Sequence, residues 1–222
     1  SSLSSAYPFS SLQNLFSGTS AIVVSSSPSI DCFIPLIKEK SKNAVIFCVD
    51  SAYHILTVNK IRPDFVITID PQPWVLEHLL DLDPTIPVLQ SFSSCFLTNK
   101  RNQRFLSLSS HPLCQIFEHH FPELIGSFDS KTGTVAGDAI LAAIKTGCSP
   151  VYVAGIDLCF PDMTIYSKNS TYNTRFTSFL NSRAKPVESL HMSYIQHSSS
   201  KTEFENKRTR HSFLQYRDKI NA

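Results

Sequence analysis

From residue 21 onward, short runs of β-branched and aromatic residues alternate with longer segments that have helical periodicity. The first runs are AIVVSSS, AVIFCVD and PDFVITIDP, and the segments between them are SIDCFIPLIKEKS and AYHILTVNK. Strands that alternate with helices are typical of parallel sheets, because each strand must return to the same edge through a crossover. We therefore predict an α/β, Rossmann-like fold, with a mostly parallel sheet and helices on both of its faces.

The alternation continues to residue 158 and contains one clear helix ending. Gly147 is placed to close a helix in a left-handed C-cap, and Pro150 follows as a stop. The remaining predicted elements are strands over residues 86–92, 104–109 and 150–158, and helices over residues 112–120 and 134–147.

The chain changes character after Phe160, where a polar stretch without clear periodicity begins. With 222 residues and 42% hydrophobic residues, the chain can bury a full core as one domain. Because it lacks an initiator methionine, we expect it to belong to a longer protein. We predict an N-terminal extension over residues 1–20, a Rossmann-like nucleotide-binding core over 21–162, and a polar excursion with a C-terminal amphipathic helix, which occupies 200–220, over 163–222.

Composition and missing motifs exclude several classes of protein. The net charge of +2 gives no global attraction to nucleic acid. The six dispersed cysteines lack metal-ligand spacing and favour free thiols in a cytoplasmic protein, without disulfides or a metal site. No apolar run reaches the roughly 18 residues of a membrane span. The absence of GxSxG, HExxH, Walker and GxGxxG motifs disfavours hydrolases, zinc proteases, P-loop ATPases and dinucleotide oxidoreductases.

Polar residues follow the predicted strands where these strands end. In an open parallel sheet, ligands bind beyond the carboxyl ends of the strands. Any one aspartate there can be a turn or cap residue, whereas the set together is suited to ribose hydroxyls or to a Mg²⁺ ion on phosphates. The set consists of Ser25, Ser26, Ser27, Pro28 and Ser29 after the first strand, Asp50 and Ser51 after the second, Asp70 and Gln72 after the third, and Gly155 and Asp157 after the last.

The segment Thr132-Gly133-Thr134 opens the predicted helix over residues 134–147. Unpaired amides and the helix dipole suit such a start to an anionic group, although a plain N-cap by either threonine is the alternative. Gly137 costs about 1 kcal/mol relative to alanine inside a helix, so we expect it to serve close packing or ligand approach.

Candidates for an acid or base are weaker. His191, His197 or His211 can reach the strand ends from the C-terminal region, and Tyr166 and Tyr172 are alternatives on the polar excursion. Trp74, just after DPQP, can stack on a ring, but a core position is the stronger expectation.

The order of these motifs resembles the DUF115 family. AIVVSSSPSID is similar to the family's strand followed by Gly-x-Gly-Pro-Ser-Leu. VIFCVDSAYHILTVNKIRPDFVITIDPQ and KTGTVAGDAILAAIKTGCSPVYVAGIDLCF resemble its second and third blocks, so the likeness covers about residues 20–162. The family includes motility accessory factors that glycosylate flagellins and archaeal 6-hydroxymethylpterin pyrophosphokinase-like proteins. The blocks are more distantly similar to bacterial sialyltransferases that use a CMP-sugar.

The resemblance implies nucleotide-sugar binding by the strand-end residues and by Thr132, Gly133 and Thr134. Both glycines of the family loop are serines here, Ser25 and Ser27, and their Cβ atoms crowd a ligand's approach. Serine hydroxyls would then have to replace backbone contacts.

Three functions follow as hypotheses. The first is a transferase that moves a nonulosonic acid from a CMP donor to a hydroxyl of flagellin or another surface protein, with no certain cofactor. The second is an ATP-dependent pyrophosphokinase in which Asp50, Asp70 and Asp157 hold Mg²⁺. The third is a degenerate nucleotide-fold module that binds a partner.

Overall fold

The computed structural model describes most of the chain. The described residues are 6–94, 98, 101–107, 116, 119–120, 132–174, 186–197, 202–204 and 207–221.

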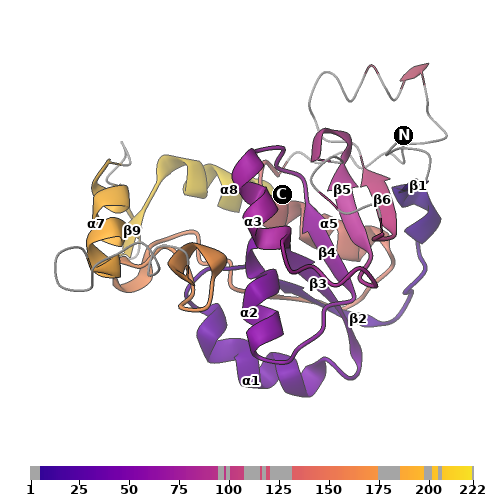
Figure 1. The fold of residues 1–222 in the computed structure, drawn as a ribbon, viewed down its shortest axis with the longest axis horizontal. Coiled ribbons are helices and arrows are strands. Elements are labelled where there is room, and N and C mark those ends of the chain that lie inside the picture. The colour runs from indigo at the N-terminus through magenta and orange to yellow at the C-terminus, as the bar shows by residue number, and fades with distance from the viewer. Residues whose placement is uncertain are drawn as a thin grey trace.

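A seven-stranded sheet forms the centre of the part of the chain that is described (Figure 1). Its order is β1-β6-β5-β4-β3-β2-β7, and every neighbouring pair is parallel. The predicted α/β, Rossmann-like fold is therefore confirmed. The strands are β1 (Ala6–Pro8), β2 (Ser20–Val24), β3 (Ala44–Val49), β4 (Phe65–Thr68), β5 (Val88–Ser91), β6 (Arg104–Ser107) and β7 (Val151–Ala154).

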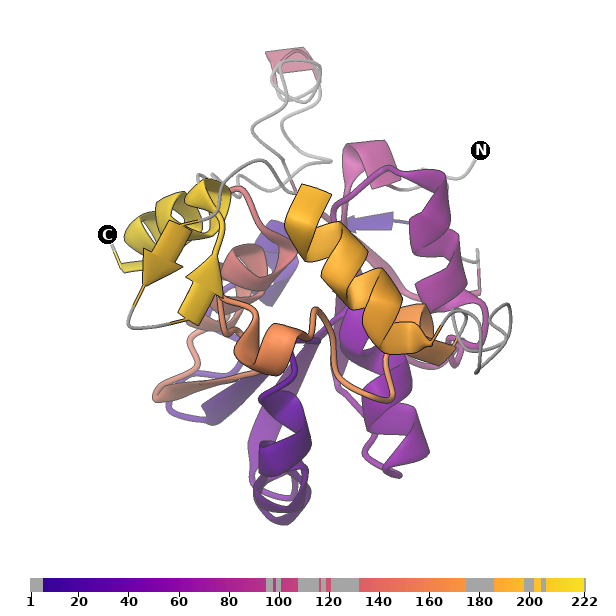
Figure 2. The ribbon, with the colours of Figure 1, turned by 90° about the vertical axis from the view of Figure 1, so that its left-hand side faces the viewer.

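Helices cover both faces of this sheet. The crossovers from β2 to β5 all move in one direction, so α1, α2 and α3 share one face, whereas α5 lies on the other face against β2, β3, β4 and β7 (Figures 1 and 2). The helices are α1 (Ile30–Lys40), α2 (Tyr53–Val58), α3 (Leu76–Leu79), α5 (Val135–Lys145), α7 (Val187–His197) and α8 (His211–Asn221), with short 3₁₀ turns η1 (Phe9–Leu12), η2 (Asp50–Ala52), η3 (Pro73–Val75), η4 (Phe92–Ser94) and η5 (Pro161–Met163).

The core follows from this two-sided coverage. The central strands are buried on both faces, so β3 and β4 are nearly continuous apolar runs rather than alternating ones. Ile30 of α1, Ile55 of α2 and Ala139 of α5 close the two sides. Among the described residues, no helix is both long and apolar enough to cross a membrane.

The end of α5 confirms the predicted C-cap. Gly147 has φ +90°, and its amide donates to the Ile144 carbonyl at 2.9 Å. The Cys148 amide donates to the Ala143 carbonyl at 3.1 Å, which completes a Schellman motif. A Cβ on Gly147 would lie 2.8 Å from Ser17 Oγ, so this glycine also lets the N-terminal segment approach closely.

The two ends of the chain contribute more to the fold than expected from their composition. Residues 6–8 form edge strand β1, and η1 buries Phe9 and Leu12. The predicted helix over residues 200–220 is wrong in its first half, which forms an antiparallel hairpin of β8 (Thr202–Phe204) and β9 (Lys207–Thr209).

Contacts with the loop after β7 explain the extended conformation of β9. The Phe160 amide donates to the Arg208 carbonyl at 2.8 Å, and Thr209 Oγ1 donates to the Leu158 carbonyl at 2.7 Å. Helix α7 was not predicted, and most of the predicted helix over residues 112–120 lies outside the described residues.

Candidate functional site

The order in which strands are added to the sheet reverses between β2 and β7, although these two strands are parallel. The loops that follow β2 and β7 lie side by side. The Ser25 amide donates to the Ala154 carbonyl at 2.9 Å, and the Ser27 amide donates to the Gly155 carbonyl at 3.1 Å. Gly155 has φ +76°, and a Cβ there would lie 2.3 Å from the Ser25 carbonyl oxygen. The glycine is therefore required for the two loops to meet. Such a switch point is where ligands bind in open α/β sheets.

Asp157 turns away from this junction toward the start of α1. Its carboxylate accepts hydrogen bonds from the Ser29 amide, at 3.0 Å, and from the Ser29 hydroxyl. A carboxylate at a helix N-terminus is stabilised by the helix dipole. The N-terminus of α1 is therefore occupied by an anion from the chain itself.

The polar excursion is attached to the loop after β2. The Ser167 amide donates to the Ser26 carbonyl at 2.9 Å, and the Ser167 hydroxyl donates to the Asp31 carboxylate. The Lys168 amide donates to the same carboxylate at 3.3 Å. These bonds fix residues 161–174 over the carboxyl ends of the strands.

Between these segments lies a cavity of about 260 Å³, which we call the strand-end cavity. Six of the predicted site residues line it: Ser25, Ser26, Ser27, Asp50, Ser51 and Thr134. Its other walls include Val135 and Ala136 of α5, Ile165 and Tyr166 of the excursion, Tyr194 of α7, and Phe213 and Tyr216 of α8.

Asp50 forms part of the floor and is 5% exposed. Its Oδ1 accepts the Ser51 amide at 2.6 Å, and the Ser51 hydroxyl lies 2.9 Å from that of Ser26. Its Oδ2 makes no ordinary hydrogen bond to the described residues, although the Thr68 hydroxyl lies beside it. Burial raises the pKa of Asp50 to about 6; Thr68 and the Ser51 amide partly offset this rise, and the charge of Asp70 adds to it.

Helix α5 points its N-terminus at the cavity. Thr134 caps the helix by accepting the Gly137 amide at 2.9 Å. The amides of Val135 and Ala136 have no acceptor within the helix, as in the first turn of any helix, and both residues line the cavity. Thr132 supports this turn from outside the cavity, because its hydroxyl donates to Asp138 Oδ1 at 2.7 Å.

The two glycines of this region serve packing. A Cβ on Gly137 would lie 2.5 Å from Thr132 Cβ, so of the two predicted roles the structure supports close packing. Gly133, with φ +75°, faces Tyr216 and Lys219 of α8.

Asp70 and Gln72 form a turn outside the strand-end cavity, in which Asp70 Oδ1 accepts the Gln72 amide at 3.0 Å. Within the described residues, no group of three or more Asp, Glu, His or Cys side chains is arranged to hold a metal ion. The set of Asp50, Asp70 and Asp157 predicted for Mg²⁺ does not converge, because Asp157 is used at the start of α1.

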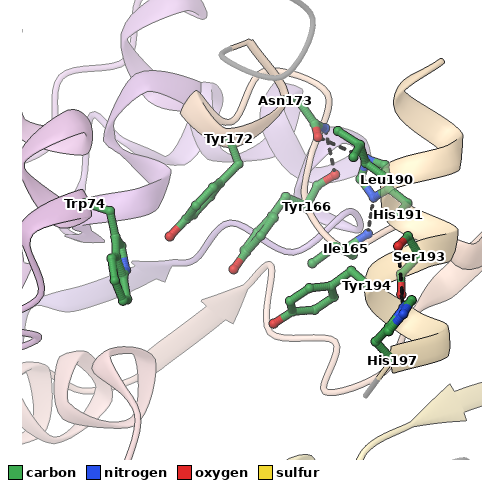
Figure 3. A pocket seen from close by; sticks show the side chains of 10 residues that line it. All are labelled: Trp74, Ile165, Tyr166, Tyr172, Asn173, Leu190, His191, Ser193, Tyr194 and His197. Atoms are coloured by element: carbon green, nitrogen blue, oxygen red, sulfur yellow. Dashed lines mark hydrogen bonds between the residues drawn. The ribbon is translucent and has the colours of Figure 1, made fainter. Parts of the chain in front are cut away.

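A second cavity, of about 640 Å³, adjoins the first through Ile165, Tyr166 and Tyr194, and we call it the outer pocket (Figure 3). The Tyr166 and Tyr172 rings stack 4.6 Å apart at 11°. Trp74 is 48% exposed at its edge, so the expected core position is wrong. The lining consists of Trp74, Ile165, Tyr166, Tyr172, Asn173, Leu190, His191, Ser193, Tyr194 and His197.

The buried histidine His78, which was not predicted as a site residue, supports this pocket from α3. Its Nδ1 shares a hydrogen bond with the Thr171 hydroxyl, and its ring meets that of Tyr172 edge-on at 4.8 Å. Burial lowers the pKa of His78 to about 4. The imidazole is thus neutral at physiological pH.

The three candidate histidines differ in their hydrogen bonds and in their positions. His191 Nδ1 accepts the Ile165 amide at 2.9 Å, so Nε2 carries the proton and donates to Asn173 Oδ1 at 3.1 Å. Burial lowers the pKa of His191, which fits a neutral structural ring. His197 donates from Nδ1 to the Ser193 carbonyl at 2.7 Å, which leaves Nε2 as an acceptor. His211 lines neither cavity.

The two tyrosines predicted as acid or base candidates remain protonated. Burial raises the pKa of Tyr166 well above its usual value, and it raises the pKa of Tyr172 to about 12. At neutral pH both phenols are therefore hydrogen-bond donors, and neither takes a proton.

Arg210 supports the wall shared by the two cavities. Its Nη1 donates to the Tyr194 hydroxyl at 2.9 Å, and its guanidinium lies 4.1 Å from the centre of that ring. It also lies over the rings of Phe160 and Phe213 at 5.3 and 5.8 Å. Within the described residues, no carboxylate forms an ion pair with it.

Comparisons with known proteins agree with the fold. The chain is 30% identical over 117 residues to an uncharacterized protein of Treponema pallidum (strain Nichols); the match covers 51% of this chain and 26% of the relative. The structure resembles that of the MAf glycosyltransferase from Magnetospirillum magneticum AMB-1, with a TM-score of 0.55 and 18% identity. That likeness covers 99% of this chain and 41% of the other, so the chain spans less than half of either protein.

Residues 2–163 match the family described as 6-hydroxymethylpterin diphosphokinase MptE-like. The match extends over the whole sheet and ends at the start of the excursion that closes the strand-end cavity. The predicted resemblance is thereby confirmed, and the chain belongs to the MptE-like family.

Proposed function

We propose that this chain is the nucleotide-binding part of a cytoplasmic, nucleotide-sugar-dependent glycosyltransferase. The donor is a CMP-activated nonulosonic acid, and the acceptor is a hydroxyl group of flagellin or another surface protein. In this proposal residues 21–162 form the nucleotide-binding core, and the described residues after 162 close the site over it.

The pair of adjoining cavities at the switch point carries the proposal. The strand-end cavity offers serine hydroxyls and the first amides of α5, which suit a phosphate group. At about 260 Å³ it is smaller than the pockets that usually enclose whole cofactors. A nucleotide sugar placed there must therefore extend past Tyr166 and Tyr194 into the outer pocket.

The transfer requires one bond to form and one to break. The acceptor oxygen bonds to the anomeric carbon, the bond from that carbon to the phosphate oxygen breaks, and CMP leaves with the electron pair. The acceptor proton passes to a base, for which we assign His197, because its Nε2 is left as an acceptor in the outer pocket. The amides of Val135 and Ala136 stabilise the departing phosphate.

The MptE-like family and the charge coupling between Asp50 and Asp70 favour a second candidate, the pyrophosphokinase. In that enzyme Mg²⁺ would bind these two carboxylates together with the phosphates of ATP. Its binding of ATP would then depend on the metal, whereas binding of CMP to a glycosyltransferase would not.

Calorimetric titration with CMP, CDP, UDP and ATP, each with Mg²⁺ and with a chelator, tests the proposal. We expect CMP to bind equally well with and without the metal. Binding of ATP alone, lost on chelation, would establish the kinase instead. If no nucleotide binds under either condition, the degenerate binding module becomes the better explanation.

A matched pair of variants locates the bound nucleotide. Ala136→Glu places a carboxylate at the cavity end of α5, and we expect CMP affinity to fall at least about tenfold. Ile144→Glu adds the same charge at the other end of the helix, where the side chain is 55% exposed, and should leave CMP binding unchanged. Equal effects of the two variants would contradict the assigned site.

A further inference from the structure

The outer pocket contains an array of aromatic side chains that the nucleotide site alone does not require. Figure 3 shows the rings of Trp74, Tyr172, Tyr166 and Tyr194 following one another along the pocket. They come from η3, the excursion and α7, so three separate segments of the fold converge on this pocket. Several aromatic faces gathered in one open pocket are suited to a flat or ring-shaped ligand.

The polar groups that line this pocket are phenols, a hydroxyl, an amide and imidazoles. Among the described residues that line it there is no aspartate, glutamate, lysine or arginine. Tyr166 and Tyr172 keep their protons because burial raises the pKa of both phenols. His191 holds one fixed tautomer between Ile165 and Asn173. The pocket thus combines ring faces with hydrogen-bonding groups that include two protonated phenols.

The strand-end cavity next to it has different chemistry. Its inner end has serine hydroxyls, Asp50 and the N-terminus of α5, and it takes the charged part of the donor in the proposed function. A ligand that fills only the outer pocket meets no carboxylate, ammonium or guanidinium group among the described lining residues, so the best match offers apolar ring faces and hydroxyl groups. A pyranose ring has these properties, because its C–H groups lie against aromatic faces and its hydroxyls exchange hydrogen bonds with phenols.

We propose that the part of the outer pocket next to Trp74 and Tyr172 is a subsite for a neutral carbohydrate ring of the acceptor. The inference rests on the proposed function, and it places the acceptor hydroxyl on a saccharide that the surface protein carries. In this arrangement Trp74 and Tyr172 provide ring faces, and Tyr166 donates its hydroxyl from the wall shared with the nucleotide site.

The composition of the chain supplies a direct probe, because Trp74 is its one tryptophan. Tryptophan emission, excited at a wavelength where tyrosine does not absorb, therefore reports on the surroundings of Trp74. Methyl β-D-galactopyranoside and methyl β-D-glucopyranoside, which do not absorb at the excitation wavelength, can be titrated with and without CMP. We expect a saturable change in Trp74 emission with at least one glycoside at millimolar concentration, which persists in the presence of CMP.

Variants at matched aromatic positions test which ring faces bind the sugar. Tyr172→Ala should weaken the glycoside at least about tenfold while CMP affinity stays unchanged. Tyr152→Ala is the control, because Tyr152 is 59% exposed on β7 and lines a different surface. Circular dichroism of both variants separates loss of binding from loss of fold.

Two results would overturn the inference. One is a Trp74 emission that no glycoside changes; the other is a signal that responds to cytidine and CMP instead, which would make the outer pocket the nucleobase site. Calorimetry with CMP keeps the two proposals distinguishable. CMP binding without glycoside binding refutes only the saccharide subsite, whereas glycoside binding without CMP binding refutes the nucleotide site.

Discussion

The strand-end cavity and the outer pocket share a wall, but they are built in different ways. The inner end of the first is formed by backbone and short polar side chains at the ends of β2 and β3 and at the start of α5. The second is formed by large aromatic side chains from segments outside the sheet. In the proposed function, the sheet therefore places the charged part of the ligand, whereas Trp74 and the described segments after residue 160 limit the size and polarity of the rest.

The largest loss of stability is expected at the contact between the loops after β2 and β7, beside the strand-end cavity. Gly155→Ala places a Cβ 2.3 Å from the Ser25 carbonyl oxygen in a backbone with positive φ, and we expect the free energy of unfolding to fall by about 4 kcal/mol or more. Chemical denaturation measures this. Gly18→Ala is the control, since Gly18 also has positive φ but no atom within 4 Å, and it should cost about 1 kcal/mol.

Removal of the buried charge of Asp50, in the floor of the strand-end cavity, should make the protein more stable at neutral pH. The pKa of Asp50 is raised to about 6, so its contribution to stability is full below the unfolded value near 4 and is lost as pH rises through 6. Asp50→Asn removes that loss, and its stability relative to the wild type should rise by about 3 kcal/mol between about pH 4 and about pH 8.

Denaturation curves across this pH range measure the difference. Asp81→Asn is the control, because it replaces an exposed aspartate and shows how the loss of one carboxylate alone changes the stability. A constant difference between Asp50→Asn and the wild type would mean that Asp50 is not buried as described.

A variant of His78, which supports the outer pocket, should change the stability with the opposite dependence on pH. The pKa of His78 is lowered to about 4, so the stability that it contributes is present above the unfolded value near 6.5 and is lost as pH falls toward 4. His78→Gln should therefore gain about 3 kcal/mol relative to the wild type as pH falls over that interval. Denaturation curves over the same pH range measure this gain. His54→Gln is the control, because it replaces a histidine elsewhere in the fold.

The smallest effect is expected at the shared wall. Arg210→Met removes the hydrogen bond to Tyr194 and the contacts with three rings, and should lower the free energy of unfolding by about 1 to 2 kcal/mol. Arg208→Met deletes the same charge from an exposed position on β9 and should change it by less than about 0.5 kcal/mol. Equal losses in both variants would show that net charge, not the wall, is responsible.

Much of the lining of the strand-end cavity could be predicted from the sequence, because the carboxyl ends of parallel strands meet at one edge of the sheet. Ser26, Asp50 and Thr134 follow or precede elements whose periodicity is clear, and all three line the cavity. Asp157 lies at the same edge, but its carboxylate is used by Ser29, a local hydrogen bond that no pattern of strands and helices reveals.

The outer site could not be predicted in this way. Tyr194, Arg210 and Phe213 follow residue 160, where periodicity is weak and where tertiary contacts decide between strand and helix. Their position depends on the hairpin β8–β9, which is held by backbone bonds to the loop after β7. An aromatic residue in a polar stretch was the one available signal, and it identified Tyr166 and Tyr172 but not the surface that they share.

The carboxylate of Asp157 at the start of α1 has a consequence for the orientation of any ligand. Because it is covalently tethered, it competes for the Ser29 amide at a very high effective concentration that a free phosphate cannot match. A phosphate group at the switch point is therefore directed to the N-terminus of α5. Substitution of this one aspartate would offer the ligand two rival helix ends, and its binding would change from one orientation to a mixture of two.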